Sequence, residues 1–417
     1  MGADSGIRSP RPLWLTETYP PSRGGMAESC DRIVRALRAA GVTVDVGHLV
    51  RRLGASARFE EQHGGRYWAW PIEDDPAHAL NLAWNTLARE AGGAGGGAGG
   101  ASGAGRSAAI GGGAPAVTHV VAFGGYLPLL AGPIFAAWLG VPLVTLIRGN
   151  DFDANLFTPR RRDVLSEALA RAALVCAVSQ DKVDRIAALH PGRRVVRVPN
   201  GIDLERFTPL PSDRTRAEAW RAANVPEGRR VLGLFGQLKR KKGGAFFLDA
   251  LGRSGRAQDV HVLLSGWIDP DMEAWLAEHG EGISVTVEPF ADRYELIHRF
   301  LACDAVVLPS FYDGMPNVMA EAAALGIPLI ASRVGGMADW LEDERTALLF
   351  EAGDESGCGW AIERAVAWPE ERLRVLGAAA RELAERELDQ RTEAERYAEL
   401  LRETLPAASP RPLRAVR

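Results

Sequence analysis

Short apolar runs rich in β-branched residues alternate with helical patterns along almost the whole chain. Successive parallel strands need a crossover connection, usually a helix, and lie buried between two helical layers. The alternation therefore predicts parallel sheets covered by helices on both faces. The expected strands are Leu13–Thr16, Val42–Val46, Val117–Phe123, Leu143–Ile147, Leu174–Val178, Val195–Pro199, Val231–Phe235, Val260–Ser265, Ser284–Val287, Ala305–Pro309 and Leu329–Ser332.

Eleven strands are many for one open sheet, and the pattern restarts after residue 200. The segment N-G-I-D-L-E-R-F-T-P-L-P-S-D, Asn200–Asp213, has the Asn-Gly and Pro residues of a turn and connector. We therefore expect two doubly wound domains, 1–200 and 201–389. A last helix at Gln390–Thr404 and a Pro/Arg tail at 405–417, expected to be disordered, complete the chain. The glycine-rich segment Ala91–Pro115 is interpreted as a flexible insertion in the first domain.

Composition predicts a globular protein, and the cysteines favour a location in the cytoplasm. It has 417 residues, 47% hydrophobic and 24% charged, with a formal net charge of −4, so no basic bias indicates nucleic-acid binding. Its four cysteines are far apart, which favours reduced, buried thiols over a metal site. The N-terminus lacks the apolar core of a secretory signal, and no run is long enough to span a bilayer. Peripheral association with the inner face of a membrane is an open alternative.

In doubly wound sheets, ligands bind beyond the carboxyl ends of the strands. The loop Pro20–Glu28 carries Gly24-Gly25, whose amides could approach a phosphate at a helix start, although a tight turn is an equal alternative. The loop G-Q-L-K-R-K-K-G, Gly236–Gly243, has four cations among eight residues before a helix. Such a loop suits a diphosphate, the alternative being a solvated basic turn.

Two further strand-end loops belong to one β-α-β-α unit. The first, Y-D-G-M-P-N-V-M-A-E, contains Asp313 and Glu321, with Asn317 as the expected N-cap of the helix. The second, S-R-V-G-G-M-A-D, supplies the amide-rich turn Gly335-Gly336. For an isolated acid, a turn or solvated helix position is the commoner explanation. Paired carboxylates also occur in glycoside hydrolases, but that class needs no basic phosphate loop beside them.

Metal ligands are not indicated. The D-F-D motif at Asp151–Asp153 and the D-P-D motif at Asp269–Asp271 are of a kind that occurs often by chance. The histidines show no zinc-like spacing, and no Ser-His-Asp or Gly-x-Ser-x-Gly pattern is present.

Taken together, these loops resemble the family 4 glycosyltransferases of GT-B architecture, with two Rossmann-like domains facing across a cleft. The main match is P-S-F-Y-D-G-M-P-N-V-M-A-E-A-A-A-L-G-I-P-L-I-A-S-R-V-G-G-M-A-D, Pro309–Asp339. The connector V-P-N-G-I-D-L-E-R-F-T-P, the loop G-Q-L-K-R-K-K-G and S-R-G-G-M-A-E are similar to further family motifs, in the family's order. The resemblance implies a retaining, metal-independent hexosyl-type transferase that uses a UDP-, GDP- or ADP-linked sugar as substrate and no further cofactor.

The resemblance also implies individual roles. Lys242 would neutralise the nucleotide diphosphate and Asp313 would hold the donor sugar, while Glu321 would bind the ribose hydroxyls. The closing of the cleft would exclude water, and the last helix would cross back onto the first domain. The other expected donor-binding residues are Gly25, Gln237, Gly314, Met315, Pro316, Asn317 and Gly336.

Three departures from the family pattern bear on these roles. Gln237 stands where Arg is frequent, with the neighbouring cations as candidates to restore the charge. The turn R-G-N-D replaces a common His-Gly turn, which makes Arg148 and Asp151 candidate contacts to acceptor or sugar. Asp313 stands where Glu is commoner and is one methylene shorter.

The sequence leaves three functions open. The first is a retaining glycosyltransferase acting on a glycan, lipid or small-molecule acceptor. The second, motivated by Gln237 and Arg148, is a non-catalytic nucleotide-sugar-binding partner of another transferase. The third is a hydrolase. Basic segments at Arg51–Leu53 and Pro159–Arg162 could meet anionic lipid or a phosphorylated acceptor, or be solvated surface.

Overall fold

The computed structural model describes residues 9–22, 24–51, 57–72, 76–92, 117–291 and 293–405. The chain forms two compact units. The first contains the described residues up to Ala177, Val183–Val198 and the chain from Ala394 onward, and the second contains Val178–Lys182 and Pro199–Glu393. Most of the glycine-rich segment and all of the tail beyond residue 405 lie outside the described residues.

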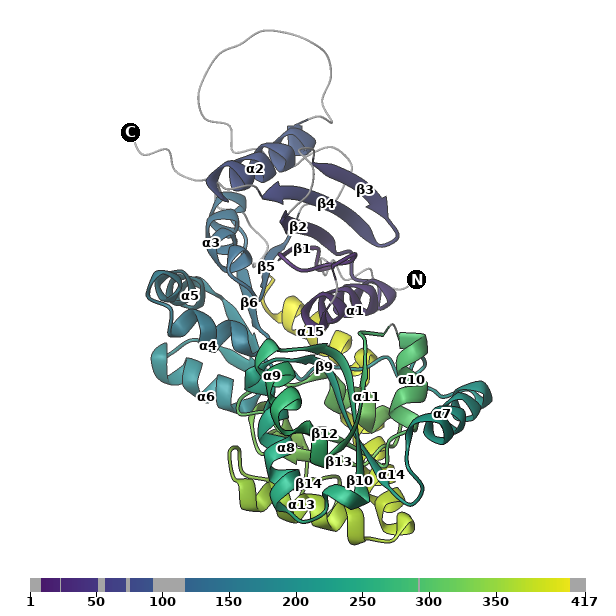
Figure 1. The fold of residues 1–417 in the computed structure, drawn as a ribbon. Coiled ribbons are helices and arrows are strands. Elements are labelled where there is room, and N and C mark those ends of the chain that lie inside the picture. Colours follow the sequence, from purple (N-terminus) through teal and green to yellow (C-terminus); the bar gives the residue numbers. More distant parts are fainter. Residues whose placement is uncertain are drawn as a thin grey trace. The chain divides into compact units, whose positions relative to one another are not determined.

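The first unit is built on an eight-stranded sheet with the strand order β3-β4-β2-β1-β5-β6-β7-β8 (Figure 1). All neighbouring strands are parallel except the β3–β4 hairpin. Its elements are β1 (Pro12–Thr16), α1 (Gly25–Ala39), β2 (Asp45–Arg51), β3 (Arg58–Gln62), β4 (Gly65–Ile72), α2 (Pro76–Gly92), β5 (His119–Phe123), α3 (Leu127–Leu139), β6 (Leu143–Ile147), α4 (Asn150–Leu156), α5 (Pro159–Arg171), β7 (Leu174–Ala177), α6 (Gln180–Leu189), β8 (Val195–Arg197) and α15 (Gln390–Glu403), the helices α6 and α15 each starting with residues of the second unit.

The second unit has a six-stranded, wholly parallel sheet in the order β11-β10-β9-β12-β13-β14. Numbered within the unit this is 3-2-1-4-5-6, the Rossmann order, with its switch point between β9 and β12. Its elements are α7 (Pro211–Asn224), β9 (Arg230–Leu238), a 3-10 helix (Arg240–Lys242), α8 (Gly244–Arg253), β10 (Val260–Ile268), α9 (Pro270–His279), β11 (Ser284–Glu288), α10 (Arg293–Leu301), β12 (Ala305–Leu308), α11 (Asn317–Ala324), β13 (Leu329–Ser332), α12 (Gly335–Trp340), β14 (Leu348–Phe350), α13 (Glu355–Ala367) and α14 (Glu370–Glu387).

Each sheet is packed on both faces, as alternating strand and helix patterns predict. In the second unit, Phe247 of α8 and Ile362 of α13 belong to the core on one face. Phe300 of α10 and Met319 of α11 belong to the core on the other face. The expectation of two doubly wound parallel α/β domains is therefore confirmed.

The sequence expectations were incomplete at one edge of each sheet and wrong about one strand boundary. The strand expected at Val42–Val46 runs from Asp45 to Arg51 instead. Its first residue, Asp45, is fully buried and is held by the guanidinium groups of Arg11 and Arg66 at 2.9 and 2.8 Å. An ion-paired carboxylate inside a strand gives no apolar signal. The sequence pattern therefore placed the strand too early, on the valines around Asp45. The strands β3, β4 and β14 were not expected.

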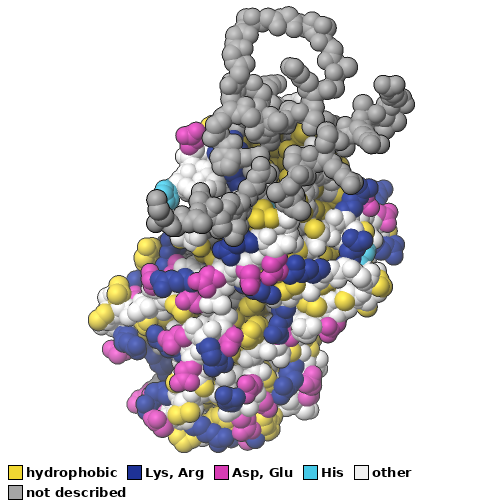
Figure 2. All heavy atoms as spheres, turned by 180° about the vertical axis from the view of Figure 1, so that it is seen from behind, with side chains coloured by type: hydrophobic (Ala, Val, Ile, Leu, Met, Phe, Trp, Pro, Cys, Tyr) yellow, Lys and Arg dark blue, Asp and Glu magenta, His cyan; other side chains and the backbone are white. Residues whose placement is uncertain are grey.

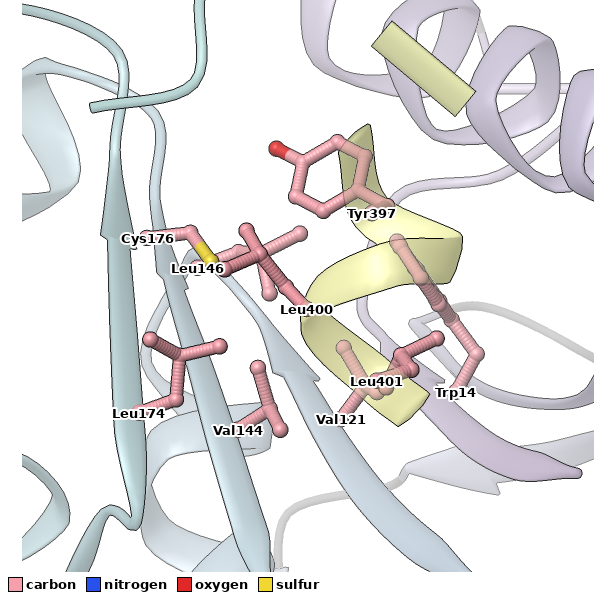
Figure 3. Close-up of a pocket in the computed structure, with 9 residues that line it drawn as sticks. All are labelled: Trp14, Val121, Val144, Leu146, Leu174, Cys176, Tyr397, Leu400 and Leu401. Carbon is pink, nitrogen blue, oxygen red and sulfur yellow. The ribbon is translucent and has the colours of Figure 1, made fainter. Parts of the chain in front are cut away.

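The helix α15 packs into the core of the first unit. Its residues Tyr397, Leu400 and Leu401 are buried against Trp14 of β1 and Val121 of β5. A small cavity of about 10 Å³ lies between this helix and the sheet and is lined by apolar side chains (Figure 3). It is no larger than a single water and offers no polar partners, so we interpret it as a packing defect and not as a ligand site.

The four cysteines are free and buried, and burial raises the pKa of Cys30, Cys176 and Cys358 to about 12 and that of Cys303 further still. Figure 2 shows basic and acidic side chains interspersed over the face it presents. No helix among the described residues combines the length and hydropathy needed to cross a bilayer.

Candidate functional site

The loop after β9 packs against the end of β12 through backbone contacts. The chain leaves β9 at Leu238, makes the 3-10 turn Arg240–Lys242 and enters α8 after Gly243. Gly243 has a φ of 69°, and a Cβ atom there would lie 2.0 Å from the carbonyl oxygen of Pro309. The amide of Phe311 donates to the carbonyl of Lys241 at 2.9 Å. Two strand-end loops at the switch point are thus in direct contact.

This contact brings Lys242 and Asp313 together. The ammonium group of Lys242 donates to Oδ2 of Asp313, and Oδ1 accepts from the amide of Gly314 at 2.8 Å. The Lys242 side chain is 26% exposed and that of Asp313 12% exposed. A cation and a carboxylate that are 71 residues apart therefore form an ion pair at the carboxyl edge of the sheet.

The turn after Asp313 is held from two sides. Asn200 of the connector donates from its side-chain amide to the carbonyl of Met315 at 2.6 Å. The amide of Gly336 donates to the carbonyl of Gly314 at 2.5 Å. A Cβ atom at Gly335, whose φ is 49°, would lie 2.1 Å from the carbonyl oxygen of Asp313. Glycines are thus needed in the loop after β13, because its backbone touches the backbone of the Asp313 turn.

The predicted donor-binding segment 314–317 is largely inward-facing. Gly314, Met315 and Pro316 are buried, and the Met315 side chain is 3% exposed within the core. The prediction that Asn317 is the N-cap was wrong. Asn317 is the first residue of α11, and Pro316, in an extended conformation, occupies the cap position. The Asn317 side chain instead faces that of Asn200.

Glu321 lies in the middle of α11 and is 8% exposed. It follows the Asp313 turn by eight residues and belongs to the same strand-to-helix connection of the second unit. At the neighbouring strand end, Gln237 is exposed and paired in register with Trp267 of β10. Of the loop's cations, Lys241 lies 5.2 Å from the centre of the Tyr312 ring.

In the first unit, Gly25 is exposed at the start of α1, after Gly24 with a φ of 123°. Arg148, at the end of β6, is 7% exposed and donates from Nη1 to the hydroxyl of Tyr397 at 2.8 Å. Its guanidinium also lies 5.5 Å from the centre of the Phe123 ring. The side chain of Arg148 therefore fastens α15 to the core of this unit.

Asp151 is in the first turn of α4 and accepts hydrogen bonds from the amides of Arg148, at 3.0 and 3.1 Å, and Phe152, at 3.2 Å. Burial raises the pKa of Asp151, although those amides and the Arg148 charge act in the opposite direction. A Cβ atom at Gly124 would lie 2.8 Å from Oδ2 of Asp151 and 2.7 Å from the methyl group of Met26 in α1. Asp151 thus lies close to Gly124 and to the end of the Met26 side chain.

The described residues contain no group of three or more His, Cys, Asp or Glu side chains arranged to hold a metal ion. One acid of each weak motif has another partner. Asp153 forms an ion pair with Arg185 at 3.4 Å, and Asp269 caps α9 by accepting from the amide of Asp271 at 3.1 Å.

Sequence reasoning missed the residues that hold the loops in place. Gly243 sets the spacing between the loops after β9 and β12, and Asn200 ties the connector to the Asp313 turn. The sequence showed Gly243 as a glycine directly before a helix and Asn200 as part of an Asn-Gly pair. Neither pattern indicates which distant residue it contacts.

The fold and the strand-end chemistry define a GT-B protein of the glycosyltransferase class. Solved structures support the fold. Sucrose-phosphate synthase from Thermosynechococcus elongatus aligns with a TM-score of 0.76 and 20% identity, covering 95% of this chain and 99% of that one. Anabaena HepE in complex with UDP-glucose aligns with a TM-score of 0.72 and 18% identity, covering 94% of this chain and 99% of that one.

The sequence matches two family models. Residues 229–367 match "Glycosyl transferases group 1", and residues 114–206 match "Glycosyltransferase Family 4". Together the two segments take in more than half of the chain. The chain therefore belongs to the family 4, group 1 glycosyltransferases, which confirms the sequence resemblance.

Curated relatives cover part of the chain. D-inositol 3-phosphate glycosyltransferase of Arthrobacter sp. is 35% identical over 170 residues, 39% of each chain. The Paenarthrobacter aurescens enzyme of the same name is 30% identical over 252 residues, 56% of this chain and 60% of its own. 2-Deoxystreptamine glucosyltransferase of Streptomyces kanamyceticus is 27% identical over 270 residues, 62% of this chain and 70% of its own. The matches to the first two relatives thus span 39% and 60% of their length.

Proposed function

We propose that the protein is a retaining glycosyltransferase that moves a hexosyl group from a nucleotide sugar to a hydroxyl-bearing acceptor. The observation that carries this proposal is the ion pair between Lys242 and Asp313 at the switch point of a Rossmann-ordered sheet. Glu321 on the helix that follows adds a second carboxylate to the same connection. Ligands of such sheets bind at this edge.

The pair supports a specific division of labour. A diphosphate leaving group gains negative charge as the glycosidic bond breaks, and a preorganised ammonium group stabilises that charge. Lys242 would leave Asp313 for the diphosphate when the donor binds. Asp313 would then accept hydrogen bonds from the donor sugar, while Glu321 would accept them from the ribose. Gly25 and the Gly335–Gly336 turn would border the bound donor, and Gln237 would contact it without adding charge.

The same reasoning supports a reaction without a bound metal, because the loop after β9 supplies cations of its own. UDP-linked sugars are the first donors to try, since HepE is solved with UDP-glucose. Two relatives are named for inositol phosphate and 2-deoxystreptamine, both polyhydroxylated six-membered carbocycles. We propose an acceptor of this class, to be tested beside glycans and lipid-linked acceptors.

The first experiment is a transfer assay in the presence of EDTA. UDP-, GDP- and ADP-glucose are each offered with a pool containing inositol phosphate, 2-deoxystreptamine, oligosaccharides and lipid-linked sugars. We expect a product with the donor's anomeric configuration, detected by mass spectrometry and NMR. Lys242→Ala should lower kcat by about 10²–10³-fold, the range seen when one charge-stabilising donor is removed. Arg253→Ala, which removes an exposed arginine of α8 that pairs with Glu355 and lies outside the loop, is the control.

Three results contradict the proposal in different ways. Undiminished transfer in the Lys242→Ala/Glu321→Ala double variant refutes the site. Donor binding by calorimetry without turnover on any acceptor favours a non-catalytic nucleotide-sugar-binding partner. Release of free sugar at catalytic rates without an acceptor indicates a hydrolase.

A further inference from the structure

The strand β11 forms one edge of the second unit's sheet, beside β10. Its side chains are half-buried or exposed along its whole length, whereas those of the central strand β12 are all buried. Among the residues that the structure describes, no backbone group of β11 hydrogen-bonds to a partner outside the sheet. An edge strand turns every second amide and carbonyl outward, so β11 presents a row of unpaired donors and acceptors.

The other three edge strands each have a feature that opposes pairing with a further strand. In β14, the amide of Leu349 donates to Oδ1 of Asp343 at 2.8 Å. The strand β8 has only 3 residues. The strand β3 is longer, but its sequence R-F-E-E-Q would place Glu60 opposite itself if two copies of the chain paired about its centre. The sequence of β11, S-V-T-V-E, has none of these features.

A second copy of the chain matches β11 in a closed, two-fold arrangement. A two-fold axis perpendicular to the sheet makes the two edge strands antiparallel, and the whole strand pairs when Thr286 lies opposite Thr286 of the second copy. Val285 then lies opposite Val287, and Ser284 opposite Glu288. Thr–Thr and β-branched pairs stabilise antiparallel strands, and no like charges face each other. A two-fold axis along the strands would set amides against amides, so parallel pairing forms no ladder.

The side chains of β11 are already arranged for such a contact. The two ring nitrogens of His261 lie 2.8 Å from the hydroxyl of Ser284 and 3.0 Å from that of Thr286. Both oxygens of Glu288 accept hydrogen bonds, one from an indole at 3.0 Å and one from a guanidinium group at 2.8 Å. Val287 is 52% exposed and offers apolar surface to be buried. Pairing therefore requires little new ordering of side chains.

We propose that β11 is a dimerisation edge at which two copies of the chain pair antiparallel about Thr286, joining their second-unit sheets into one continuous sheet. The inference is independent of the proposed function. The strand complements its own reverse at every position, which favours a second copy over an unrelated extended segment. A ladder of this length is short, so we expect the dimer to be reversible.

Cysteine cross-linking of the full chain tests the register. Residues directly opposite in an antiparallel pair have Cα atoms about 4.5–5.5 Å apart, which a disulfide can span. The four native cysteines are buried, so a thiol introduced on the edge is the one that reacts. Under mild oxidation, Thr286→Cys should give a covalent dimer on a non-reducing gel. Val285→Cys and Val287→Cys should each give no covalent dimer alone but should cross-link when mixed, because each lies opposite the other. Glu60→Cys on β3 is the control.

Sedimentation velocity over a series of protein concentrations measures the reversible contact. We expect the wild-type chain to pass from monomer to dimer as the concentration rises. Val287→Lys should weaken dimerisation about tenfold, because a charge replaces the apolar partner of Val285 twice in each dimer. Leu189→Lys, at a 51% exposed position of α6, is the matched control and should leave dimerisation unchanged.

Three results would overturn the proposal. The first is a wild-type chain that stays monomeric at the highest soluble concentration. The second is a dimer that Val287→Lys leaves unchanged, and the third is equal cross-linking by Thr286→Cys and Glu60→Cys. If Thr286→Cys does not fold after losing its bond to His261, the mixture of Val285→Cys and Val287→Cys tests the same register. No cross-linking in that mixture then refutes the proposal.

Discussion

Replacing Gly243 by alanine tests whether the site depends on the close approach of two loops. Gly243 has a φ of 69°, and left-handed backbone costs an alanine about 1–2 kcal/mol. The added Cβ would also lie 2.0 Å from the carbonyl oxygen of Pro309. That backbone atom has to shift by an ångström or more, and forced repacking costs about a further 1–3 kcal/mol. We expect Gly243→Ala to lower the free energy of unfolding by about 2–5 kcal/mol.

Gly255→Ala is the matched control, because Gly255 has a φ of 73° and no atom within 4 Å of a built Cβ. Gly255→Ala should lower the free energy of unfolding only by the cost of left-handed backbone, about 1–2 kcal/mol. Urea unfolding followed by tryptophan fluorescence measures both losses, and UDP binding is measured below the transition. Gly243→Ala should also weaken UDP binding, since the shift moves Lys242 relative to Asp313, whereas Gly255→Ala should not. Equal unfolding losses for the two variants would refute the close-approach argument.

Three further predictions concern the first unit. Burial alone would raise the pKa of Asp45, but hydrogen bonds from Arg66 and Arg11 outweigh it and lower that pKa. Asp45→Ala should therefore lower the free energy of unfolding by about 3–5 kcal/mol at pH 7. In urea unfolding, the difference between this variant and the wild type should shrink as the pH falls through the lowered pKa of the carboxyl group. Burial lowers the pKa of His48 to about 4, so between pH 6.5 and 4 the unfolded chain binds a proton that the folded chain does not. The free energy of unfolding of the wild type should therefore fall by up to about 3 kcal/mol across this pH range. His48→Gln should remove this fall, which thermal unfolding at a series of pH values measures. Leu400→Ala on the buried face of α15 should cost about 2–5 kcal/mol, whereas Leu189→Ala, 51% exposed, should stay within about 0.5 kcal/mol by the same measurement.

The fold was largely predictable because strand and helix periodicity repeats along the chain, and the missing parts have local causes. The strand Arg58–Gln62 is charged, as suits the edge of a sheet, and carries little apolar signal. The strand Leu348–Phe350 has three residues, too few for any pattern. The boundary error at Asp45 came from an ion pair whose partners lie 34 and 21 residues away.

The sequence predicted which loops form the candidate site, but not how their side chains lie relative to one another. Spacing and residue type indicated Lys242, Asp313 and Glu321, but a sequence pattern does not state that the ammonium group of Lys242 meets Asp313. Arg148, a candidate contact to acceptor or sugar, donates to Tyr397 of the last helix, and no sequence pattern showed that bond. Long-range pairs of this kind form only once the sheet order brings distant segments together.

In the proposed donor site, the ion pair also limits how Asp313 would bind the donor sugar. Its Oδ1 accepts from the amide of Gly314 at 2.8 Å, and that amide lies in a turn held by Asn200 and the Gly335–Gly336 loop. When a diphosphate takes Lys242, only Oδ2 is released. The released oxygen would then hold one sugar hydroxyl, because breaking the bond to Gly314 would leave a buried amide unsatisfied, at a cost of about 1–3 kcal/mol. The shorter acid thus favours a single, directional contact to the donor, whereas a glutamate at this position could extend past the turn and reach a second hydroxyl.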